Sequence, residues 1–226
     1  MSEQLSLAMT IIPIEFLNTL YMLIVPTLLS IIIGGPIGVL LLITSKEHLM
    51  ENKIIHWILS NLVNIGRSIP FIILMVTLIP LTRLIIGTSL GTTASIIPLT
   101  FAASPFFARI VENSLLEIDK GVIEAAETMG STPWQILTKV LIWETLPSLI
   151  LGITNLMVNL IAYSAMAGTI GGGGLGKITI QYGYQRFNGF LMILTIVLLV
   201  ILVQCIQFLG DTISKKLNKK IGRSLK

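Results

Sequence analysis

Long uncharged runs alternate with short polar connections along this chain. A helix needs about 20 apolar residues, at about 1.5 Å each, to cross a hydrocarbon core of about 30 Å. Four runs reach that length: Phe16–Ser45, Leu84–Ala108, Thr145–Gly176 and Phe187–Gly210. A fifth run, Ile54–Thr82, is interrupted by Arg67, so its early part can lie in the interface before a span from about Ser68 to Leu81. The pattern predicts an all-α integral membrane protein with five transmembrane helices.

The composition agrees with a chain whose solvent is partly lipid. Of 226 residues, 54% are hydrophobic and 12% are charged, whereas charged residues make up about 25% of a typical soluble domain. The first apolar run is about twice as long as the core of a cleavable signal peptide, so we expect a retained span. With no linker evident, we expect residues 1–226 to form a single membrane domain.

The distribution of lysine and arginine predicts the orientation, because basic residues concentrate at the cytoplasmic ends of spans. With five spans and a cytoplasmic C-terminus, the inner side holds Lys46, Lys53, Arg109, Lys120, Lys139, Lys215, Lys216, Lys219, Lys220, Arg223 and Lys226. The outer side then holds only Arg83, Lys177 and Arg186, so we expect the N-terminus outside. The basic tail, residues 211–226, is expected to lie beside anionic lipid rather than to bind nucleic acid.

The segment from about 115 to 146 is long, partly polar and cytoplasmic in this topology. Asp119 is a good N-cap for a short helix over residues 120–129, and Gly130 stands where that helix would end in a left-handed residue. Directly afterwards, Thr132 at the N-cap and Gln135 three residues later form a capping-box pattern with proline between them. The sequence predicts a short helix, a glycine break and a second helix that continues into the fourth span.

This segment carries a longer pattern. Glu124-Ala125-Ala126, three further residues, Gly130, nine further residues and then Val140-Leu141-Ile142 resemble the EAA loop of ABC importer permeases. The second half departs from the family's pattern, because Trp143 stands at the usual proline position and the nearest proline is Pro147. The resemblance is therefore stronger in the first half.

In that family the short helix is the coupling helix, which sits in a groove of a cytoplasmic ATPase. The resemblance implies that this role falls here to Glu124, Ala125, Ala126, Glu127 and Gly130. Small alanine side chains allow close helix approach, carboxylates can meet basic groups of a partner, and Gly130 allows a sharp exit. The alternative is an ordinary cytoplasmic loop helix.

Residues 64–71, 163–176 and 182–184 look like methionine importer permeases. The resemblance implies a type I permease fold in a bacterial cell membrane, a homodimer, two cytoplasmic ABC ATPase subunits and an extracytoplasmic substrate-binding lipoprotein. It also implies a path for methionine, with hydrolysis supplied by the ATPase, so the chain is not expected to be an enzyme or to hold a cofactor or metal. An importer of the same type for another amino acid or small polar solute is the alternative.

The fourth span carries polar residues at helical spacing. Asn155, Asn159, Tyr163 and Met166 fall within about 80° of arc, because each residue advances a helix by about 100°. Such a stripe either faces a water-filled path or bonds neighbouring helices. By resemblance, Ser164 and Met166 belong to the region of the gate. Arg67 is expected to serve a structural role at the membrane boundary rather than to contact substrate.

Two other classes of protein are weighed against a permease. The literal phosphate-loop pattern over residues 171–177 is rejected, because Ile178 stands where serine or threonine would hold magnesium, and we expect a flexible outer loop there. A cation-coupled transporter should carry acidic residues in its spans, whereas all Asp and Glu are assigned to tails, loops or span borders. A structural membrane protein would not need the spaced EAA pattern.

Overall fold

The computed structural model describes residues 2–46, 48 and 50–221, and within them every element is a helix. The helices of the first half are α1 (Ser2–Thr44), α2 (Lys53–Ser68), α3 (Phe71–Thr77), α4 (Ile79–Ile86) and α5 (Thr92–Leu116). The second half holds α6 (Lys120–Thr128), α7 (Pro133–Gln135), the π-helix η1 (Ile136–Leu141), α8 (Ile142–Thr169), α9 (Gly174–Ile178), the π-helix η2 (Thr179–Tyr184) and α10 (Gly189–Ile221).

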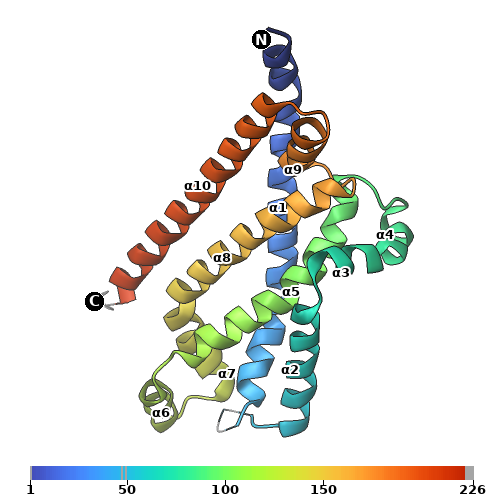
Figure 1. Cartoon of the computed structure of the whole chain (residues 1–226). Coiled ribbons are helices and arrows are strands. Elements are labelled where there is room, and N and C mark those ends of the chain that lie inside the picture. The colour runs from blue at the N-terminus through green and yellow to red at the C-terminus, as the bar shows by residue number, and fades with distance from the viewer. Residues whose placement is uncertain (1, 47, 49, 222–226) are drawn as a thin grey trace.

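The chain runs repeatedly between two ends of an elongated bundle (Figure 1). Helices α1, α5 and α10 run from the end that holds the N-terminus toward the other end, and α8 runs back. The last turns of α1, the start of α2, α6 and α7 lie at the end away from the N-terminus, while α9 lies near the N-terminal end. In the described part of the chain four helices are long and apolar enough to cross a membrane, or five if the bent pair α2 and α3 forms one span.

The longest helix, α1, packs most closely on α5, because two glycines of α1 let the backbones approach. A Cβ on Gly34 would lie 2.4 Å from the Ser104 carbonyl oxygen, and a Cβ on Gly38 would lie 2.4 Å from that of Ala108. Glycines four residues apart lie on one face of a helix and are a common device of close helix packing in membranes. The α1–α5 pair forms the centre of the bundle.

The sequence predicts an interfacial part followed by a span from about Ser68 to Leu81. The chain does bend at that boundary, but the residues after it form two short helices, α3 and α4, instead of one span. Helices α2 and α3 meet at 99°, and Ile69 between them has an extended backbone with φ −79° and ψ 122°. Pro70 explains the break, because a proline disfavours the helical conformation of the residue before it. The predicted bounds of the next span were also wrong: Leu84 belongs to α4, and α5 begins at Thr92.

The fourth span begins earlier and ends earlier than Thr145–Gly176. The helical run starts at Pro133, passes through η1 and α8 without a break at Pro147, and stops at Thr169. The glycine-rich residues after it turn back and enter α9, whose Leu175 is fully buried. The expected flexible loop is therefore a packed part of the bundle.

Candidate coupling loop and translocation face

The loop helix α6 forms where the cap residues predict it. The Asp119 carboxylate accepts a hydrogen bond from the backbone N–H of Gly121 at 2.7 Å. At the other end, Gly130 has φ +78° and donates to the Glu127 carbonyl, while the N–H of Ser131 donates to the Ala126 carbonyl. These two bonds are the Schellman pattern, which requires a left-handed residue after the helix. The predicted N-cap and left-handed exit are confirmed.

The second helix begins with the predicted capping box. Thr132 Oγ1 accepts a hydrogen bond from the Gln135 N–H at 3.4 Å, and Gln135 Oε1 accepts one from the Thr132 N–H at 2.9 Å. The helix continues through η1 into α8. Because both ends of the turn between α6 and α7 are fixed by local hydrogen bonds, α6 is held at a defined angle to the start of α8.

Ala126 and the half-buried Ile123 anchor α6 to the core, and the other predicted coupling residues face outward. Ala126 is 3% exposed and belongs to the main hydrophobic core. Glu124, Ala125, Glu127 and Gly130 are exposed. This arrangement leaves two carboxylates and one small side chain on the outer surface of α6, while Ala126 packs against the chain itself. The outward face of α6 can receive a complementary groove.

The polar stripe of α8 is only partly covered by the chain. Asn155 is exposed and Asn159 is half-buried, and neither carboxamide makes a hydrogen bond to any part of the chain that the structure describes. Met166 is 44% exposed. Bonding to a neighbouring helix of the same chain therefore does not account for these carboxamides. The two carboxamides are left without a hydrogen-bond partner within the described part of the chain.

Two residues of the predicted path have neighbours inside the chain. The Tyr163 ring stacks on Phe71 of α3, with ring centroids 4.7 Å apart and planes 8° from parallel. Ser164 is buried, and its hydroxyl donates to the Ile161 carbonyl at 2.8 Å. The stack joins α3, just beyond the Pro70 break, to the middle of the stripe, whereas Ser164 lies on the inner side of α8.

Arg67 and Arg109 both have structural neighbours near α5. The Arg67 guanidinium lies 5.6 Å from the Phe106 ring centroid, in the range of a cation–π contact. Arg109 pairs with buried Glu112 and donates to Asn64 Oδ1 at 2.7 Å, which links α5 to α2. The Arg109 network was not predicted, although a basic and an acidic residue three apart on one helix face was an available signal.

The sequence assigns every Asp and Glu to tails, loops or span borders, but the candidate spans of the structure include Glu15, Glu112, Glu144 and Asp211. Two of these four, Glu15 and Glu112, are buried. Glu112 lies within α5, and Glu15 lies within the apolar helix α1, where it is 8% exposed. Each is ion-paired, Glu112 with Arg109 and Glu15 with Lys177. Among the described residues no three histidine, cysteine or acidic side chains gather as a metal site.

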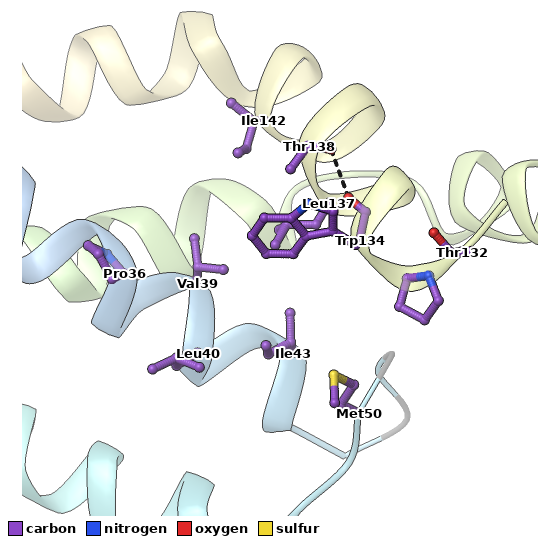
Figure 2. Close-up of a pocket in the computed structure, with 11 residues that line it drawn as sticks. Pro36, Val39, Leu40, Ile43, Met50, Thr132, Trp134, Leu137, Thr138 and Ile142 are labelled. Atoms are coloured by element: carbon purple, nitrogen blue, oxygen red, sulfur yellow. Dashed lines mark hydrogen bonds between the residues drawn. The ribbon is translucent and has the colours of Figure 1, made fainter.

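An apolar groove lies between the last turns of α1 and the helical run formed by α7 and η1 (Figure 2). It encloses about 690 Å³. Val39 and Ile43 of α1 face Trp134 and Leu137 across it, and the Thr138 hydroxyl that borders it is bonded to the Trp134 carbonyl at 2.8 Å. The exposed ring of Trp134 gives this end of the bundle an apolar surface beside the coupling loop.

Comparison with known proteins defines the class. Residues 30–222 match the family described as "Binding-protein-dependent transport system inner membrane component". The chain therefore belongs to the family of inner membrane components of binding-protein-dependent transport systems.

Individual relatives make the likeness more specific. The probable D-methionine transport system permease protein MetI of Vibrio cholerae is 48% identical over 203 residues, which are 90% of each chain. The methionine import system permease protein MetP of Bacillus subtilis is 44% identical over 181 residues, covering 80% of this chain and 82% of that one. Both comparisons extend over most of each chain.

Solved structures confirm the expected permease fold. A structure of the MetNI methionine ABC transporter in an inward-facing conformation matches with a TM-score of 0.91 and 49% identity, covering 92% of this chain and 97% of that chain. A solved amino acid ABC transporter, at 17% identity and a TM-score of 0.74, shares the fold. The all-α type I permease architecture is thus established.

Proposed function

We propose that this chain is the membrane-spanning permease of an ATP-driven methionine importer, working as a homodimer with two cytoplasmic ABC ATPase subunits and an extracytoplasmic substrate-binding lipoprotein. The observation that carries the proposal is the likeness to the MetNI transporter over 92% of this chain. The relatives in Vibrio and Bacillus whose names specify methionine support the choice of substrate.

The outward face of α6 is the proposed ATPase contact. Glu124 and Glu127 are exposed three residues apart, so both carboxylates lie on adjacent positions of one helix surface. Ala125 leaves room for close approach, and buried Ala126 ties α6 to the core. A force applied to α6 would reach α8 through the capped turn at Thr132, because α7, η1 and α8 form one helical run.

The uncovered face of α8 is the proposed wall of the translocation path. Asn155 and Asn159 are expensive in contact with lipid unless they meet a polar neighbour or water. A second copy of the chain would place a matching stripe opposite this one. Between two such stripes the carboxamides would line a polar path, with Met166 narrowing it at the gate.

The proposed orientation puts α6 in the cytoplasm and the N-terminus outside. Basic residues support this assignment, because Lys120 and Lys139 border the coupling loop at the same end of the bundle as Lys53. Closure of the ATPases would then push both α6 helices and rotate the spans. Access to the path would alternate between the two sides of the membrane.

Competition during uptake tests the substrate. The chain is co-purified with its ATPase, reconstituted in proteoliposomes and supplied with labelled methionine and the binding lipoprotein. We expect unlabelled methionine in large excess to abolish uptake of label, and histidine, leucine or glutamine to leave most of it. Stronger competition by another amino acid would refute methionine as the substrate and favour the importer alternative.

A further inference from the structure

A carboxylate of α1 holds the glycine-rich segment, residues 171–177, that follows α8. Glu15 Oε2 accepts a hydrogen bond from the Gly174 N–H at 2.7 Å, and Glu15 Oε1 lies 3.2 Å from Lys177 Nζ. One turn further along α1, Thr19 Oγ1 accepts from the Leu175 N–H at 2.8 Å. Residues four apart share a helix face, so one face of α1 binds two consecutive N–H groups.

The surroundings of this contact leave little room for another arrangement. Leu175 is fully buried, and Glu15 is 8% exposed. A Cβ on Gly174 would lie 2.9 Å from Thr19 Oγ1, and one on Gly173 would lie 2.8 Å from a methyl carbon of Thr92. Asn18 adds a donor to the same carboxylate oxygen at 2.9 Å. A carboxylate inside an apolar helix is costly unless it is paired in this way.

The glycine-rich segment also packs on the last turns of α8. A Cβ on Gly176 would lie 2.3 Å from Ala165 Cα, and one on Gly168 would lie 2.5 Å from the Lys177 backbone nitrogen. These contacts flank Met166, whose side chain is on the uncovered face of the same helix. A displacement of the segment toward α8 therefore requires the end of α8 to move, and a displacement away from it removes this packing.

We propose that Glu15 is a positioning residue that sets the glycine-rich segment, and through it the Met166 end of α8, relative to α1. The identification of this end of α8 as a gate rests on the proposed function. The two partners of the ion pair are unequal. Glu15 binds a backbone N–H as well as the ammonium, whereas the half-exposed Lys177 donates one hydrogen bond to the carboxylate and holds no part of the backbone.

Amide hydrogen exchange of the purified full-length chain tests the contact directly. With Glu15→Ala the Gly174 amide should exchange about tenfold faster or more, because its hydrogen bond to a charged acceptor is lost. The Leu175 amide, which is bonded to Thr19 on the same face of α1, should also exchange faster because the segment is no longer held beside it. Glu15→Gln keeps an acceptor oxygen and should have a smaller effect, and Lys177→Met a smaller one still. The control Asp211→Asn removes an exposed carboxylate on α10 and should change nothing in this segment.

Two results would overturn the inference. One is wild-type exchange of Gly174 and Leu175 in the Glu15 variants. The other is an effect of Lys177→Met as large as that of Glu15→Gln, which would reduce the contact to a simple ion pair. If Glu15→Ala does not purify as a folded chain, the Glu15→Gln and Lys177→Met comparison decides the same question.

Transport then tests the positioning role. In proteoliposomes with the ATPase, Glu15→Gln should assemble normally but lower methionine uptake per ATP hydrolysed, and Asp211→Asn should match wild type. Faster exchange with unchanged uptake per ATP would refute a role at the gate. Failure of the wild type to transport methionine would refute the proposed function instead, and the exchange comparison would still decide the contact.

Discussion

Gly130 offers the sharpest test of the coupling loop, because this position calls for glycine only through its backbone conformation and not through lack of space for a side chain. Its φ is +78°, and a Cβ added there would meet nothing within 4 Å. Holding an L-residue in this left-handed region costs about 1–2 kcal/mol, which corresponds to a factor of about 5–30 between conformations. The exit of α6 can relax alone, so we expect the rest of the fold to persist.

The expected order of effects among substitutions at Gly130 follows from how readily each residue adopts a positive φ. Asn tolerates the left-handed region, Ala less so, and a β-branched residue least. Gly130→Val should therefore give a permease that inserts in the membrane but loses stable association with its ATPase, Gly130→Ala an intermediate yield and Gly130→Asn nearly wild-type recovery. The assay is the amount of ATPase that co-purifies with a tagged permease in detergent.

Two other glycines serve as matched controls. Gly87 also has a left-handed backbone, φ +85°, and a Cβ added there would meet no atom within 4 Å, but it ends α4 far from α6 in the chain. Gly189 has equal space around it and no left-handed φ. Valine at either position should leave ATPase recovery unchanged. Full recovery with Gly130→Val, or equal loss with Gly87→Val, would refute the coupling role of the α6 exit.

Two further predictions concern orientation and the path. In a Cys205→Ala background, a membrane-impermeant thiol reagent applied to intact cells should label the Ser6→Cys variant but not the Ser224→Cys variant. Labelling of both variants, or of Ser224→Cys alone, would overturn the five-span topology. Met166→Ala should keep ATPase assembly but change methionine uptake per ATP hydrolysed. Met157, whose side chain packs on the core, serves as the comparison, and Met157→Ala should change this ratio little. Equal uptake per ATP in both variants and wild type would assign the stripe to packing.

The coupling loop could be predicted closely because its determinants are local. Asp119, Thr132 and Gln135 bond N–H groups two or three residues away, and a left-handed glycine after a helix has a short sequence signature. What the spacing could not give was the direction of each side chain. Ala125 and Ala126 are equivalent in the pattern, yet only Ala126 packs on the core.

The parts that were missed depend on contacts between distant segments. Glu15 and Lys177 are 162 residues apart, so nothing near either residue in the sequence identifies the other. The available signal was a lone acidic residue ahead of a long apolar run, four residues before Thr19. The bend at Pro70 had a local signal, but the 99° angle also depends on how α3 packs against α5 and α8.

The central claim is that this chain forms a path driven by ATP hydrolysis in a separate subunit. Uptake of labelled methionine should be measured in proteoliposomes that hold the permease, the ATPase and internal ATP, with the binding lipoprotein outside. We expect uptake that requires hydrolysable ATP and persists when ionophores collapse proton and sodium gradients. Uptake without ATP that disappears when those gradients collapse would contradict the claim.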